Sequence, residues 1–235
     1  MPHPEASSYT IRFHPAEGAA WRLRTRIEND FAGQRMAIET DAVQRVLSVE
    51  PSGLRRVETI CESMRMVDPI TRDAPCAPPE VALLDGAARP HEPGNTESVA
   101  GSTSNGRPIF LAYPPHPVSV GDTWHDVARW RDPGSTQVFA VDATYALVSV
   151  TPRGDDLDAI VRMRGPLTMT DEAADPAARG SAEGEVSGEF VLQVATGFLR
   201  ETTFDMAFVV TSPASEGGGT ARARVRVVAR SEPLP

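Results

Sequence analysis

The sequence predicts an all-β protein: one large antiparallel sheet, curved into a half-barrel or folded into a sandwich. Apolar residues recur at every second position through most of the 235 residues, a period that is typical of strands with one buried face. Turns rich in glycine and proline separate these segments, and amphipathic helices are missing from the pattern. A set of residues also occurs twice, which indicates that one unit of strands is used twice.

The repeat has two parts, spaced by roughly a hundred residues. His14-Pro15-x-x-Gly18-x-x-Trp21 returns as His116-Pro117-x-x-x-Gly121-x-x-Trp124. Ser48-Val49-x-Pro51-x-Gly53 returns in the same order as Ser149-Val150-x-Pro152-x-Gly154. We therefore expect two equivalent meander units, residues 9–67 and 109–169, within a single all-β domain that spans residues 1–235.

In the first unit we expect strands over 21–27, 35–49 and 54–67. Trp21, Leu23 and Ile27 alternate with Arg22, Arg24 and Arg26, so the two sets face opposite sides of the sheet. Pro51-Ser52-Gly53 is typical of a turn between two strands. In the returning strand, the same alternation places Val57, Thr59 and Cys61 on the face opposite Ile60, Met64 and Met66.

Residues 68–108 have no regular period and many prolines and glycines. We expect a long connection with one helical turn at Val81–Leu84. A connection of this length is unusual within a compact domain, so it is either a hinge between the units or a flap over a site. Cys76 lies in its proline-rich part, and Cys61 lies in the preceding strand. The two are either unrelated thiols or a disulfide in an exported protein.

In the second unit, residues 136–150 alternate but are apolar on both faces, which predicts a strand covered on both sides. The C-terminal strands fall within residues 185–230. Two of them join at Ala195-Thr196-Gly197, and the last, over 220–230, places Arg222, Arg224 and Arg226 opposite Ala221, Ala223, Val225 and Val227.

Charge and hydropathy exclude several classes of protein. The formal net charge is −9, so a nucleic-acid partner is not expected. No run of apolar residues is long enough to span a membrane as a helix. The first residues lack the pattern of a signal peptide. The chain is therefore cytoplasmic as written, or belongs to the cell envelope if a leader was removed. The sequence sets neither the compartment nor the oligomeric state.

Two groups of arginines suggest a candidate anion surface: Arg22, Arg24 and Arg26, and Arg222, Arg224 and Arg226. Arginine suits bidentate capture of a carboxylate or phosphate. The alternative is a solvated face on which the arginines pair with carboxylates of neighbouring strands. Candidate partners are Glu58, Glu62, Glu185, Glu189, Glu201 and Asp205.

Trp21 and Trp124 each follow a glycine at the start of a strand, so they either fill equivalent parts of the core or line an apolar cavity between the units. The candidate residues for that core or cavity are Trp21, Trp124, Met64, Met66, Phe139 and Tyr145. Methionines on strands provide adaptable apolar surface, which suits a lipid-like ligand and an ordinary core equally.

No catalytic, cofactor-binding or metal site is expected. The glycine-rich phosphate loop and the nucleophile motif of hydrolases are missing. His116, His125, Asp122 and Asp126 surround the second glycine–tryptophan pair, but their spacing is not that of metal ligands.

The segment Pro114-Pro115-His116-Pro117-Val118-Ser119-Val120-Gly121-Asp122-Thr123-Trp124 resembles the P-x-x-P-V-x-V-G-D-x-W segment of a group of uncharacterised bacterial β-rich domains, many of them exported or lipid-anchored. Tyr145-Ala146-Leu147-Val148-Ser149-Val150 resembles the strand that follows in that group, and Gly188 to Gly197 is similar to its later hairpin. The resemblance covers roughly residues 9–70 and 109–230. It implies a fold similar to the half-open barrels of bacterial lipoprotein carriers and implies no catalytic residues.

These observations predict a non-enzymatic binding protein, a carrier or sensor domain with an apolar cavity between the curved sheet and residues 68–108. The ligand would be an apolar or lipid-like small molecule, and the cavity should exceed a few hundred Å³. The alternative is a structural or assembly module that binds a protein through its sheet edges or arginine faces. An enzyme of unknown type is the third reading.

Overall fold

The computed structural model describes residues 7–68, 70–89, 111–131, 136–172, 175, 179–213 and 217–235 of the chain. Eleven strands form one antiparallel sheet, which confirms the all-β prediction. They are β1 (Ala20–Phe31), β2 (Gln34–Val49), β3 (Arg55–Asp68), β4 (Ile70–Ala74), β5 (Glu80–Leu84), β6 (Thr123–Arg131), β7 (Gln137–Arg153), β8 (Asp156–Asp171), β9 (Ser181–Gln193), β10 (Leu199–Ser212) and β11 (Gly219–Pro233).

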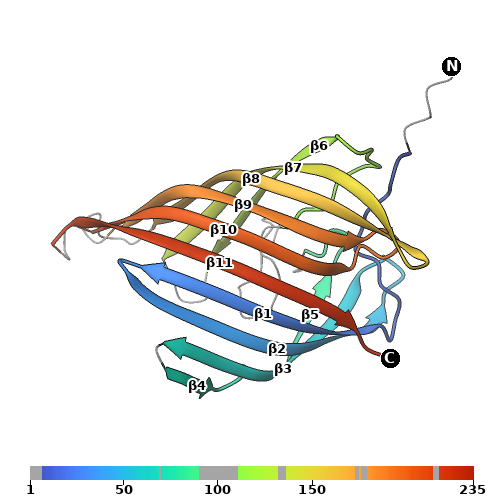
Figure 1. The fold of residues 1–235 in the computed structure, drawn as a ribbon, viewed down its shortest axis with the longest axis horizontal. Helices are drawn as coiled ribbons and strands as arrows, with labels where there is room; N and C mark the ends of the chain where they lie inside the picture. The colour runs from blue at the N-terminus through green and yellow to red at the C-terminus, as the bar shows by residue number, and fades with distance from the viewer. Residues whose placement is uncertain are drawn as a thin grey trace.

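The strand order is β4-β3-β2-β1-β11-β10-β9-β8-β7-β6, and β5 also pairs with β3. The first repeat supplies β1–β3, the second supplies β6–β8, and the C-terminal strands lie between them. The sheet curls, so that β6 and β7 at one end of the order and β5 at the other lie behind the central strands (Figure 1). It is not closed into a barrel. No helix among the described residues is both long and apolar enough to cross a membrane.

The two repeats have the same local geometry. Gly18 and Gly121 have positive φ angles of 80° and 99°, a region that favours glycine. The Gly18 amide donates to the Val46 carbonyl at 2.9 Å, and the Gly121 amide donates to the Leu147 carbonyl at 2.8 Å. A β-bulge follows in each unit, after Val46 and after Leu147. The sequence repeat is therefore a repeat of structure.

The core lies at the end of the sheet where β1 and β6 begin. Irregular segments cover the inner face there, and we call residues 8–19, 85–89 and 111–122 the covering segments. They contribute Ile11, Phe13, Ala112, Tyr113 and Val118 to the buried cluster, which also contains both repeat tryptophans. A single bridge between Tyr9 and Val118 joins two of the segments. No second sheet packs on this face among the described residues.

Two glycines mark close approaches between neighbouring strands. A Cβ atom on Gly165 of β8 would lie 2.1 Å from the Asp142 carbonyl oxygen, and one on Gly184 of β9 would lie 2.2 Å from the Ala207 carbonyl oxygen. No side chain fits at such distances. Glycine within a strand permits the tight bending that a curled sheet needs.

The structure corrects two expectations. Residues 136–150 are not covered on both sides, because Asp142 and Thr144 on the outer face of β7 are exposed. The 68–108 connection is also not wholly irregular, because β4 and β5 occupy part of it and Val81–Leu84 is extended rather than helical. Its residues 90–108 lie outside the described residues.

β4 and β5 together form an interrupted edge strand. β4 pairs with residues 64–68 of β3, and β5 pairs with residues 55–59. Between them, a proline-rich segment passes residues 60–63 without strand pairing. A disulfide between Cys61 and Cys76 connects β3 to this segment, which settles the pairing that the sequence left open.

Candidate functional site

A small cavity of about 80 Å³ lies between the inner face of the sheet and the covering segments. Four aromatic residues line it: Phe13, Trp21, Tyr113 and Phe198. The aliphatic lining is Leu23, Val57, Leu84, Ala88, Leu111 and Leu199, and Gln44 and Ser231 are the remaining residues. None of the described residues that line it has a charged side chain. The cavity is smaller than the few hundred Å³ expected from the sequence.

Trp21 is held in place at the floor of the cavity. Its Nε1 donates to Gln44 Oε1 at 2.8 Å, and Gln44 Nε2 donates to Thr59 Oγ1 at 3.0 Å. Phe198 packs edge-on against the indole, with ring centroids 5.1 Å apart, and Phe13 does so at 6.3 Å. The indole N–H of Trp21 and the side-chain amide of Gln44 therefore each have a hydrogen-bond partner in the core. Phe13 and Phe198 pack against the indole and fix its orientation.

In the second repeat, an aromatic side chain occupies the position that corresponds to Gln44. Trp124 is opposite Tyr145 across β6 and β7, as Trp21 is opposite Gln44 across β1 and β2. The rings of Trp124 and Tyr145 stack, with centroids 5.7 Å apart and an interplanar angle of 12°. Burial raises the pKa of the Tyr145 phenol well above its ordinary value, and the nearby Asp126 carboxylate adds to the shift.

Residues 85–89 form a turn that lies over the inner face, where Ala87 and Ala88 pack against the core. Asp85 Oδ1 accepts from the amides of Ala87 and Arg89, both at 2.8 Å, which shapes the turn. Arg89 forms an ion pair of 2.6 Å with Asp126 of β6. Because β5 pairs with β3, this segment connects the two edges of the curled sheet. The Phe13 amide also donates to the Gly86 carbonyl at 2.8 Å.

The turn between β9 and β10 anchors the other covering segments. Tyr113 Oη donates to the Gly197 carbonyl at 2.5 Å, and the His14 amide donates to the Thr196 carbonyl at 2.8 Å. A Cβ atom on Gly197 would lie 2.0 Å from the Arg12 carbonyl oxygen. The close approach of the N-terminal segment therefore requires glycine here.

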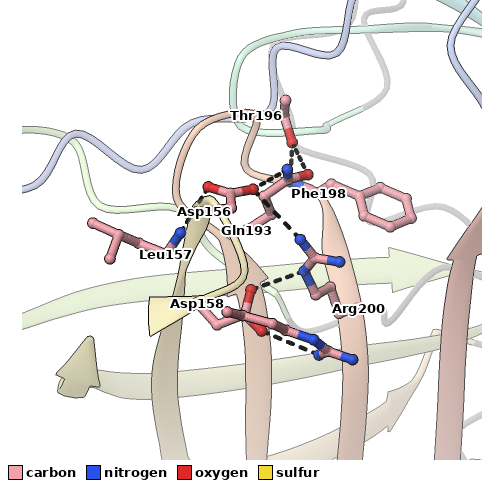
Figure 2. Close-up of polar contacts among 8 residues, drawn as sticks. Asp156, Leu157, Asp158, Gln193, Thr196, Phe198 and Arg200 are labelled. Carbon is pink, nitrogen blue, oxygen red and sulfur yellow. Dashed lines mark hydrogen bonds and ion pairs between the residues drawn. The ribbon is translucent and has the colours of Figure 1, made fainter. Parts of the chain in front are cut away.

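Figure 2 shows a polar network beside this turn that the sequence did not predict. Asp158 is almost fully buried, with Oδ1 2.8 Å from Arg200 Nε and Oδ2 3.1 Å from Arg153 Nη1. Asp156 accepts a hydrogen bond from Gln193 and lies 3.4 Å from Arg200. Two carboxylates face two guanidinium groups, so the charges balance. The network joins the β7–β8 turn to the β9–β10 turn. Its role is therefore structural, because it holds these two turns together.

The arginines of the candidate anion surface lie on the outer face, opposite the cavity, and most of them are paired. Arg22 contacts Glu62 at 3.0 Å, Arg24 contacts Asp41 and Glu232 at 3.3 and 3.5 Å, and Arg224 lies 4.0 Å from Asp205. Arg26 pairs with Glu28 and Glu39. The hydrogen bond to Glu28 is the main reason that the pKa of Arg26 is raised.

In sheet register, Arg226 is opposite Glu28 on one side and Asp205 on the other. Arg222 is opposite Val209. Two hollows of about 370 and 460 Å³ lie along this face, and each is lined by four arginines and three carboxylates. The near balance of charge favours paired surface residues over an anion-binding surface.

The structure does not bring the other candidate residues to the cavity. Met64 and Met66 lie farther along the inner face, and Met66 is exposed. The sequence placed them opposite Cys61, but a bulge in the β2–β3 pairing puts them on its side of the sheet. Phe139 packs half-buried at the edge of the core. Trp21 is the one predicted residue that lines the cavity.

The histidines and aspartates near Trp124 are dispersed. His125 contacts Asp142 on the outer face, whereas Asp126 faces inward to Arg89. Asp122 accepts from the Ser119 amide at 2.8 Å, and His116 is exposed. In the described part of the chain, no three potential ligands form a group that could hold a metal ion.

No protein-family model matches the chain, and a search of the curated proteins found no match either. The resemblance to bacterial β-rich domains therefore remains a prediction.

Proposed function

We propose that this protein is a non-enzymatic binding protein that holds a small apolar molecule between its curled sheet and the covering segments. The cavity beside Trp21 is the observation on which this rests. Its walls are mostly apolar and include four aromatic side chains, and one side of it is formed by irregular chain instead of by a strand or helix. Ligand sites of this kind are concave, mostly apolar and provided with a few polar groups.

The covering segment 85–89 is the part of the wall that can move. Leu84 and Ala88 line the cavity at this segment. Beyond β5, its contacts with other described residues include the Arg89–Asp126 ion pair, a backbone hydrogen bond to Phe13, and packing of Ala87 and Ala88 against the core. An ion pair with both groups partly exposed contributes about 1 kcal/mol or less. Outward movement of this turn therefore costs far less than separation of two strands.

The size of the cavity limits the ligand. A volume of 80 Å³ corresponds to two or three water molecules at about 30 Å³ each. An acyl chain of a lipid does not fit, so the ligand we propose is a small molecule.

The alternative of an assembly module has less support. Its arginine faces carry charges that are already compensated within the sheet. The prolines at positions 75, 78 and 79 in the interrupted edge strand oppose pairing with another chain there, because proline lacks the amide donor.

The proposal is tested with cyclohexanol, titrated calorimetrically into the purified protein, and with native mass spectrometry for a co-purified molecule. We expect cyclohexanol to bind the wild type. Leu23→Phe enlarges a buried wall residue and should weaken binding at least tenfold, whereas the matched control Val209→Phe, on the outer face, should bind as the wild type does. Failure of the wild type to bind either cyclohexanol or phenol, together with a mass that shows no adduct, would refute the proposal.

A further inference from the structure

The two repeats differ in the residue that lies opposite the tryptophan. Trp21 and Gln44 occupy the same places in the first unit as Trp124 and Tyr145 in the second. The Tyr145 phenol stacks on Trp124 and is buried. Gln44 is shorter and has no ring, and the space beside it is the cavity. At the register position where the second unit has a phenol that stacks on the indole, the first unit has an amide that accepts from the indole N–H and lines the cavity.

We infer that the ligand of this cavity is a neutral molecule with a single aromatic ring, such as a phenol, which packs beside Trp21 as Tyr145 packs beside Trp124. This inference rests on the proposed function and specifies its ligand. Aromatic pairs with offset-stacked or edge-to-face geometry are favoured beyond the burial of their area. Phe13, Tyr113 and Phe198 surround the same space, so an entering ring meets aromatic groups on several sides.

The polar groups of the lining fit a neutral ligand. Aromatic walls also suit cations such as quaternary ammonium groups. However, none of the described residues that line the cavity carries a carboxylate, and a buried cation without a partner is strongly disfavoured. The hydroxyl group of Ser231, which is buried at the cavity, can both donate and accept a hydrogen bond. It therefore suits the hydroxyl group of a phenol.

The cavity is too small for an aromatic ring unless one of the covering segments moves. A dry cavity of about 150 Å³ holds benzene, and this one has about 80 Å³. A ring is therefore accommodated when residues 85–89 move outward, which carries Ala88 away from the indole. The sheet itself, including Trp21 and Gln44, stays in place.

The test compares phenol with cyclohexanol, which has similar size and the same hydroxyl group but no aromatic ring. Stacking energies correspond to roughly a threefold to tenfold preference for phenol, measured calorimetrically on the wild type. Gln44→Tyr supplies the missing ring from the chain itself and should weaken phenol binding at least tenfold. Gln34→Tyr, at an exposed position of β2, is the matched control and should bind phenol like the wild type.

A second measurement does not depend on a variant. Phenol should change the proton chemical shift of the Trp21 indole N–H through its ring current, while cyclohexanol should not. Equal affinity for phenol and cyclohexanol, or unchanged phenol binding by folded Gln44→Tyr, would overturn the aromatic assignment and leave the proposed function standing. Binding of neither compound by the wild type would overturn both.

Discussion

Removal of the Cys61–Cys76 disulfide should destabilise the protein by about 3 kcal/mol. The bond joins residues 15 apart in sequence, and closing a loop of that length restricts the unfolded chain by about 3 kcal/mol. The native state is also affected, because the bond lies at residues 60–63, where β3 has no partner strand between β4 and β5. Without it, two short ladders alone hold the interrupted edge strand.

The measurement is guanidinium unfolding of Cys61→Ala/Cys76→Ala beside the oxidised wild type. With an m-value of roughly 5 kcal/mol/M, a loss of 3 kcal/mol lowers the midpoint by about 0.6 M. Wild type reduced with dithiothreitol is the matched control, and its guanidinium midpoint should equal that of the double variant. In the variant, amide hydrogen exchange should become faster than in the wild type, with the largest change in residues 80–89, because they are attached to the sheet through this edge.

Two results would contradict this reasoning. A loss of stability below about 1 kcal/mol would mean that the bond neither restricts the unfolded chain nor supports the edge. Two free thiols, found by titration of protein purified without reductant, would contradict the pairing itself.

Two further predictions concern the sheet. Gly184→Ala should lower the free energy of unfolding by about 1–3 kcal/mol, the range for overpacking, because its Cβ would lie 2.2 Å from the Ala207 carbonyl oxygen. Urea denaturation measures this loss. Gly86→Ala is the control and should show no such loss, because a Cβ there meets nothing within 4 Å. Because the pKa of Tyr145 is raised in the folded state, its contribution to stability is fully present below the ordinary tyrosine pKa of about 10 and is lost as pH rises through the folded pKa. Stability measured in urea should therefore fall above about pH 10, and an equal fall in Tyr145→Phe would contradict this assignment.

The local features of the sheet were predictable, because alternation and turn residues act over a few neighbours. The repeat predicted the equivalent positions of Trp21 and Trp124, and the arginine pattern predicted an outward face on β11. The predicted face of Met64 was wrong, because a β-bulge shifts the alternation of β3 by one residue. Such a bulge depends on the pairing of two strands and has no signature in the sequence of either one.

An apolar cavity against residues 68–108 was expected, but most of its lining was not predictable, for a related reason. Gln44 is an ordinary polar residue in an alternating strand, and its significance follows from the position of Trp21 on the neighbouring strand and from the segments above both. The buried Asp158 is a similar case, because Arg153 and Arg200 reach it from different turns. These sites are assembled by long-range topology. The β4–β5 strand was obscured by its prolines, which are typical of loops.

The pairing of β1 with β11 has a consequence for biosynthesis. Leu23 is opposite Ser231, so one edge of β1 stays without its neighbour until a strand about 200 residues later in the chain has been synthesised. Synthesis proceeds from the N-terminus at about 5–20 residues per second, which leaves the first strands incomplete for roughly ten seconds or more. The central part of the sheet is therefore completed only once β11 has been synthesised, and β1 keeps an unpaired edge until then.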